Sequence, residues 1–266
     1  MTPNALGAAI RKASDGGEVV RSLFQTGLDS YRRELTQRFL AQYGHVIQTG
    51  VFRGMALPEE ASWGDGDKLP KLLGSYEMEL HPVLENAFAQ DYSLVLNIGC
   101  AEGYYAVGAA RRLASARVCA FDVSDTARRV CAKSAEINGA ADRLEVYGRC
   151  CAETLEHLLT PGAKCLLIID CEGAEIQLLK PDLVPALSLA DMLIECHDFV
   201  NRRLTKRLCE RFAQTHEIEW IREGARPAAI HPFLQRLTGF ERALAMCEFR
   251  PEPMHWLFCS SRAREG

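Results

Sequence analysis

The chain has 266 residues, of which 48% are hydrophobic and 25% are charged, so it can bury one large core or a core with a smaller appendage. Its net charge of −4 argues against nucleic acid as a partner, because proteins that grip long nucleic acids carry a basic surplus. The 11 cysteines form no C-x-x-C pair, and no apolar run approaches the roughly 18 residues that span a bilayer. We therefore expect a cytoplasmic protein without structural zinc or a membrane segment.

The N-terminal part of the sequence predicts helices and a hairpin. Apolar residues recur at helical spacing from Glu18 to about Tyr43, which predicts a long helix. Apolar and polar residues alternate around Gly50 and Gly54, which predicts a short hairpin. The segment "KLLGSYEMELHPVLENAFA" predicts one or two helices with a break near Pro82. We expect residues 1–75 to form a helical and hairpin cap.

From residue 93 onward, apolar strand patterns alternate with helical patterns. Strands are predicted at 93–99, 116–124, 143–148, 164–173, 190–198, 217–222 and 254–261. This alternation predicts an α/β fold with a Rossmann-like, doubly wound sheet of seven mostly parallel strands. The last two strands lack a helical crossover, so we expect the last strand to be antiparallel. Residues 76–266 would form this core, with an insert at 223–253 between the last two strands.

The stretch "LNIGCAEGYY" predicts a glycine turn between the first strand and its helix. Gly99 and Gly103 let the backbone come close to a ligand, and the positive end of the following helix points toward it. Ala101 breaks the G-x-G-x-x-G spacing of dinucleotide-binding loops, which argues against NAD. Asp122 ends the second predicted strand, where a carboxylate can bind ribose hydroxyls. The alternative role of Asp122 is that of a helix N-cap, which Ser124 could also fill.

The G-x-x-x-G spacing resembles the first motif of class I S-adenosylmethionine-dependent methyltransferases. "IIDCEGAEIQLLK" and "LIECHDF" resemble the following strand ends of the FkbM-like members, and the resemblance covers about residues 94–199. It implies S-adenosylmethionine as cofactor and a methyltransferase core. The chain departs from the family pattern at two sites. An amide replaces the usual acidic residue of the first motif, and "GRCCAETL" follows the third strand where family members often carry an acidic residue near the adenine amino group. The cofactor contacts that the resemblance implies are Asn97 (this amide), Gly99, Cys100, Ala101, Glu102, Gly103, Tyr104, Asp122, Val123, Cys151, Ala152 and Asp170.

Acidic residues and a histidine gather at the ends of the fourth and fifth predicted strands. In one interpretation His197 is a general base, oriented by a carboxylate such as Asp170, with Glu195 beside it. In the other, a divalent metal is held by Asp170, Glu195, His197 or Asp198. Both interpretations fit a hydroxyl acceptor, which must lose its proton.

Four side chains are predicted to contact the acceptor: Glu172, Asp198, His231 and Tyr76. Glu172 and Asp198 could equally cap the helices that follow them, and His231 could be an ordinary loop residue of the insert.

The function that the sequence favours is methyl transfer from S-adenosylmethionine to a small-molecule acceptor, with oxygen preferred and with base or metal assistance. An RNA or protein methyltransferase, an NAD-dependent oxidoreductase and a non-enzymatic relative of the same fold are the alternatives. A homodimer is compatible with the sequence.

Overall fold

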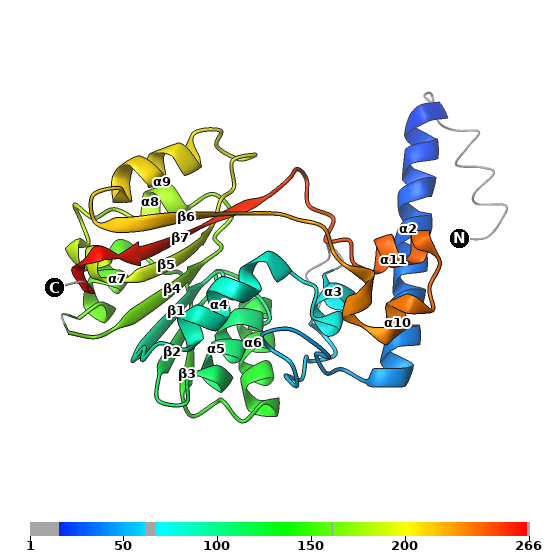
Figure 1. Cartoon of the computed structure of the whole chain (residues 1–266), viewed down its shortest axis with the longest axis horizontal. Helices are drawn as coiled ribbons and strands as arrows, with labels where there is room; N and C mark the ends of the chain where they lie inside the picture. Colours follow the sequence, from blue (N-terminus) through cyan, green and yellow to red (C-terminus); the bar gives the residue numbers. More distant parts are fainter. Residues whose placement is uncertain (1–15, 62–66, 161, 265–266) are drawn as a thin grey trace.

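Seven strands form one sheet in this computed structural model, which describes residues 16–61, 67–160 and 162–264. The strands lie in the order β3-β2-β1-β4-β5-β7-β6 (Figure 1). The first five are parallel, and β7 is antiparallel to both of its neighbours, as predicted. Their bounds are β1 Leu94–Ile98, β2 Arg117–Phe121, β3 Leu144–Tyr147, β4 Cys165–Ile169, β5 Asp191–Glu195, β6 His216–Arg222 and β7 His255–Ser261.

Helices cover both faces of the sheet, because the central strands are apolar on both sides. In β1, Val95 belongs to one buried cluster, while Leu94 and Leu96 belong to the other. The first face is covered by α4 (His81–Phe88), α5 (Tyr104–Arg112) and α6 (Asp125–Ile137). The second face is covered by α7 (Ala152–Leu158), α8 (Glu175–Leu178) and α9 (Leu204–Phe212). The 3₁₀ turn η2 (Pro185–Leu189) packs on the same face through Leu187, and η4 (Arg262–Arg264), which follows β7, contacts η2.

The strand order reverses between β1 and β4, which are neighbours although β2 and β3 separate them in the chain. In open parallel sheets, ligands bind beyond the carboxyl ends of the strands at this switch point. Gly99 follows β1 and Asp170 follows β4, so the fold brings the glycine turn and the acidic strand ends to one edge of the sheet.

The N-terminal segment contains the helix α2 (Gly16–Tyr43), which confirms the predicted helix from Glu18. A single antiparallel bridge joins Val46 to Ala56, where the hairpin was predicted. The predicted break near Pro82 corresponds to the junction between η1 (Met78–Leu80) and α4, which begins at His81 and carries Pro82 in its first turn, where proline is tolerated. A second interruption follows α3 (Lys68–Leu73), where Gly74 takes a left-handed conformation.

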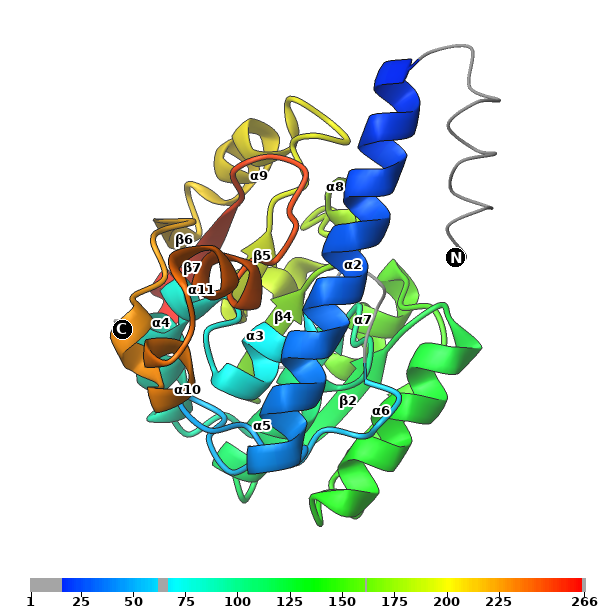
Figure 2. The same ribbon diagram turned by 90° about the vertical axis from the view of Figure 1, so that its right-hand side faces the viewer.

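The insert between β6 and β7 folds into η3 (Ala228–Ile230), α10 (Pro232–Gln235) and α11 (Gly239–Ala245). Figures 1 and 2 show that α10 and α11 lie beside α2 on one side of the molecule. Phe39 of α2 packs edge-on against Phe233 of α10, with ring centroids 5.2 Å apart. None of the helices in the described segments combines the length and apolar character needed to cross a bilayer.

Candidate functional site

The turn between β1 and α5 depends on its glycines. A Cβ atom added to Gly99 would lie 1.5 Å from the backbone oxygen of Asp170, and one added to Gly103 would lie 2.9 Å from the sulfur of Cys131. Both glycines have positive φ angles, 83° and 90°, and Ala101 between them has a φ of 45°. The turn is therefore pressed against the end of β4, and its backbone takes a conformation that glycine adopts without strain.

Asp122, which follows the end of β2, stabilises this turn through a hydrogen bond. Its Oδ2 atom accepts a hydrogen bond from the backbone N–H of Ala101 at 3.0 Å, and its Oδ1 atom accepts one from the N–H of Ser124 at 2.8 Å. The N-cap of α6 is Ser124, whose hydroxyl accepts from Ala127. Asp122 is half-buried and a carboxylate has about four acceptor positions, so it keeps capacity for a ligand. Beside it, Val123 is 68% exposed.

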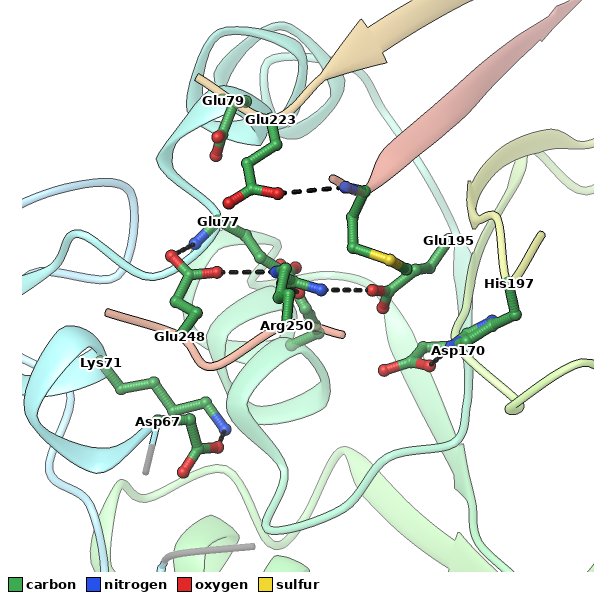
Figure 3. A network of polar contacts seen from close by, with 12 residues as sticks. Asp67, Lys71, Glu77, Glu79, Asp170, Glu195, His197, Glu223, Glu248 and Arg250 are labelled. Atoms are coloured by element: carbon green, nitrogen blue, oxygen red, sulfur yellow. Dashed lines mark hydrogen bonds and ion pairs between the residues drawn. The ribbon is translucent and has the colours of Figure 1, made fainter. Parts of the chain in front are cut away.

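Two polar side chains lie buried beneath the turn. Asn97 is 1% exposed; its Nδ2 atom donates to the backbone oxygen of Ile168, while its Oδ1 atom has no hydrogen-bond partner within the described residues. Glu102 is fully buried and pairs with Lys71 at 2.5 Å, and Lys71 also pairs with Asp67 (Figure 3). Burial alone would lower the pKa of Lys71, but the two carboxylates outweigh it and raise the pKa. Glu102 thus ties the turn to α3.

The other residues implied as cofactor contacts lie on either side of the turn. Cys100 and Tyr104 are buried, and the Tyr104 ring packs against Tyr76 with centroids 5.3 Å apart. Cys151 is exposed as the N-cap of α7, and Ala152 is the first residue of that helix.

A cavity of about 190 Å³ opens at the carboxyl ends of β4 and β5. It brings together five of the residues predicted from the sequence: Tyr76, Asp170, Glu172, Glu195 and His197. The remaining walls come from Phe199 after β5, from the insert and from Met254, which directly precedes β7. These residues are Phe199, Glu248, Phe249, Arg250, Pro251 and Met254.

His197 is the centre of this cavity's polar groups and is only 3% exposed. Its Nδ1 atom lies 2.8 Å from Oε1 of Glu175, and its Nε2 atom lies 3.4 Å from Asp170 and 3.5 Å from Glu172. Burial alone would lower the His197 pKa, but the hydrogen bond to Glu175 and the carboxylates around it outweigh burial and raise the pKa.

Glu175 is the direct hydrogen-bond partner of His197, and the sequence interpretation did not single it out. It is fully buried, and Oε1 also accepts the backbone N–H groups of Cys171 and Gly173. Burial tends to raise its pKa, but the hydrogen bond to His197 and these N–H groups lower it, so Glu175 is held as a carboxylate. Glu175 is the last acidic residue of the motif "DCEGAE", but the sequence does not show where its side chain points, because this depends on how the short helix α8 packs.

The carboxyl groups of Asp170 and Glu195 influence each other. Burial, followed by the charges of Glu195 and Glu77, raises the Asp170 pKa well above its usual range, although 35% of its side chain stays exposed. Burial and the charge of Glu77 raise the pKa of Glu195 to about 7, against the opposing effect of Arg250. Oδ1 of Asp170 has no hydrogen-bond partner within the described part of the chain.

Arg250 joins three separate segments beside the cavity (Figure 3). Its guanidinium group pairs with Glu77 and Glu195, each at 2.5 Å, and with Glu248 at 3.0 Å. Glu248 also pairs with Arg226 at 2.6 Å. The sequence did not single out Arg250, because the insert carries no pattern that indicates which of its arginines turns inward.

Two predicted acceptor contacts lie outside the residues that line the cavity. Asp198 accepts hydrogen bonds from the N–H and the hydroxyl of Thr205, at 3.1 and 2.7 Å, at the start of α9. His231 caps α10 through the N–H of Phe233, and its ring lies 4.8 Å from that of Tyr43 in α2. Asp198 therefore takes its alternative role at the start of a helix, whereas His231 is neither a cavity residue nor an exposed loop residue but a buried helix cap.

Backbone strain gathers around the same region. Within the described ranges, four residues other than glycine have positive φ angles: Glu77, Ala101, Glu172 and Phe249. Ala101 belongs to the glycine turn, Glu77 pairs with Arg250, and the other two line the cavity. Such conformations persist where the surrounding structure enforces them, and they are common at functional sites.

Comparison with known proteins finds no matching family model and no matching curated protein. Among solved structures, the O-methyltransferase TomG from Streptomyces achromogenes in complex with SAM is similar at 15% identity and a TM-score of 0.48, over 72% of this chain and 83% of that one. An O-methyltransferase from Bacillus cereus in complex with SAH is similar at 15% identity and a TM-score of 0.46, over 87% and 91%. Similarities this weak carry no argument about function, so the site must be interpreted from its own geometry.

Proposed function

We propose that the chain is an enzyme that transfers a methyl group from S-adenosylmethionine to an oxygen atom of a small molecule. One observation carries the proposal. The backbone of Asp170 touches Gly99 of the glycine turn, while its side chain lines the cavity with His197. A cofactor on the turn and an acceptor in the cavity would therefore be neighbours, and transfer between two bound partners depends above all on such proximity.

The residues around the turn fit this cofactor. Asp122 retains acceptor capacity for ribose hydroxyls, and the exposed Val123 offers an apolar surface for a base. The unpartnered Oδ1 of Asn97 can accept from an ammonium group. When bound, S-adenosylmethionine supplies a methyl group on a sulfonium. In this proposal the remaining contacts are Gly99, Cys100, Ala101, Glu102, Gly103, Tyr104, Cys151, Ala152 and Asp170.

The cavity residues divide into positioning and proton-accepting roles. Glu175 holds the imidazole of His197 so that Nε2 faces the cavity, where it can accept the proton of a hydroxyl group or bind a metal. Glu195 stands beside Asp170 but pairs with Arg250. Tyr76 and Glu172 would contact the acceptor. The segment 1–75 and the insert 223–253 would act as a cap and a wall of the acceptor site.

The size of the cavity favours a small accepting group. About 190 Å³ is close to the volume of a cavity that holds a single aromatic ring. The cavity is open on one side and shares Glu248, Phe249 and Arg250 with a neighbouring hollow of about 460 Å³, so the rest of the acceptor can extend beyond it. The proposal is tested against two alternatives: methyl transfer to RNA or protein, and an NAD-dependent oxidation or reduction. A cytoplasmic location and a homodimer remain predictions from the sequence.

The first test is cofactor binding, measured by calorimetry on the full chain with S-adenosylmethionine, S-adenosylhomocysteine and NADH. We expect the first two to bind and NADH not to bind. Asp122→Ala removes the carboxylate that would meet the ribose, and we expect it to weaken binding roughly 10- to 100-fold, the usual effect of losing hydrogen bonds to a charged group.

Asp125→Ala is the matched control, because it removes an acid three residues away whose side chain is 86% exposed. It should leave cofactor affinity unchanged. Thermal unfolding of both variants checks that the turn held by Asp122 is still folded. Binding of NADH without S-adenosylmethionine, or equal affinity in Asp122→Ala and the native chain, would contradict the proposed function.

A further inference from the structure

The acceptor cavity has more acidic side chains than its basic groups can neutralise. Four carboxyl groups line it, from Asp170, Glu172, Glu195 and Glu248. Arg250 pairs with Glu195 and Glu248, and its third contact goes to Glu77 behind them. Asp170 and Glu172 are left with the imidazole of His197 as their neighbour.

These three side chains converge on a common point. One ligand atom from each of Asp170, Glu172 and His197 lies within 4.8 Å of the other two. Oδ1 of Asp170 is inaccessible to solvent and has no hydrogen-bond partner within the described residues, which is costly for a carboxylate oxygen. Two carboxylates and one imidazole, arranged in this way, offer a cation three ligands and an open side toward the cavity.

His197 has the carboxylate partner on one ring nitrogen that is usual for metal-binding histidines. Its Nδ1 atom bonds to the fully buried Glu175, which is itself fixed by two backbone N–H groups. A carboxylate on one ring nitrogen sets the tautomer and leaves the other nitrogen, here Nε2, with its lone pair directed at the ligand.

Two further acids near these strand ends are occupied elsewhere. Glu195 is drawn to Arg250 at 2.5 Å, and Asp198 accepts two hydrogen bonds from Thr205 and lies 3.3 Å from His255. The structure therefore favours Glu172 as the third ligand, in place of the Glu195 and Asp198 that the sequence suggested.

We propose that Asp170, Glu172 and His197 bind a divalent cation, with Glu175 positioning the histidine. The mixed oxygen and nitrogen ligands suit Mn²⁺, because carboxylates favour Mg²⁺, Ca²⁺ and Mn²⁺ whereas imidazole favours the transition metals. The open positions face the cavity, where oxygen atoms of the acceptor would complete the coordination. The binding of the cation stands on this geometry alone; its role toward the acceptor rests on the proposed methyl transfer.

The test is Mn²⁺ binding to the full chain after treatment with a chelator, without cofactor, measured by electron paramagnetic resonance. We expect one site, with ¹⁴N modulation in pulsed spectra from the imidazole. Asp170→Asn should weaken binding at least 10-fold, and His197→Gln should remove the ¹⁴N signal. Glu175→Gln should weaken binding 10- to 100-fold, the usual effect of losing the partner of a metal-bound histidine, with an altered ¹⁴N signal.

Asp198→Asn is the matched control, because Asp198 lies outside the residues that line the cavity, and it should keep the affinity of the native chain within about threefold. Absence of Mn²⁺ binding at millimolar concentration would overturn the proposal, as would binding that depends on Asp198 as much as on Asp170. Calorimetry with S-adenosylhomocysteine on the same samples separates the two proposals. If the cofactor binds and Mn²⁺ does not, only the proposed metal site is contradicted. If Mn²⁺ binds and the cofactor does not, only the proposed methyl transfer is contradicted.

Discussion

At the scale of single residues, the contact between Gly99 and Asp170 is the closest link between the glycine turn and the cavity. Gly99→Ala would place a methyl group 1.5 Å from a backbone oxygen that cannot move without shifting the end of β4. We expect this variant to lose cofactor binding and to have a lower free energy of unfolding, measured by chemical denaturation.

The matched control is Gly139→Ala, which has a similar positive φ angle of 63° but no atom within 4 Å of the added Cβ. Gly139→Ala should lower the free energy of unfolding by about 1–2 kcal/mol, the penalty of a left-handed alanine. Gly99→Ala combines that penalty with steric overlap, which adds about 1–3 kcal/mol or more. Equal costs for the two variants would show that the turn is not pressed against β4.

At the scale of elements, α2 and α11 are joined by one carboxylate. Glu241 completes a capping box with Thr238 at the start of α11, and its Oε1 atom accepts from Tyr31 at 2.9 Å and Arg38 at 3.0 Å in α2. The bonds to Thr238 and then those to Arg38 and Tyr31 lower the pKa of Glu241 to about 2.

A lowered pKa means that Glu241 stabilises the fold above its unfolded value near 4.5, and that this stabilisation is lost as pH falls toward about 2. We expect Glu241→Gln, which preserves the capping box, to lower the melting temperature at pH 7. The difference from the native chain should narrow steadily below about pH 4.5. A difference that is constant from pH 7 to pH 3 would show that the charge of Glu241 does not contribute.

The elements were more predictable from the sequence than the contacts of the site. The strands and α2 follow from local apolar periodicity, so their type and their succession along the chain were correctly predicted. The convergence of Asp170 and His197 follows from their places at neighbouring strand ends. Two other contacts were not predictable: the hydrogen bond of Glu175 to His197 and that of Asp198 with Thr205. Both depend on how α8 and α9 pack, and no local sequence pattern specifies that packing.

At the scale of the whole molecule, Arg250 connects parts that are far apart in the chain. Glu77 belongs to the segment before η1 (Met78–Leu80), Glu195 ends β5, and Glu248 and Arg250 belong to the insert. All three glutamates are less than 9% exposed. Their charges are removed from water, so Glu77 and Glu195 depend on the guanidinium group of Arg250 for compensation, and Glu248 is compensated by Arg250 together with Arg226.

We therefore expect Arg250→Met to lower the free energy of unfolding by about 3–5 kcal/mol, the usual cost of leaving buried charges without their partner. Adding Glu77→Gln and Glu195→Gln should recover part of this loss, because the uncompensated charges disappear. Arg202→Met is the matched control, since Arg202 pairs with Glu252 but is 72% exposed, and an exposed pair contributes about 1 kcal/mol or less. If chemical denaturation gives the same loss for Arg250→Met and Arg202→Met, Arg250 does not hold the insert and the N-terminal segment over the end of β5.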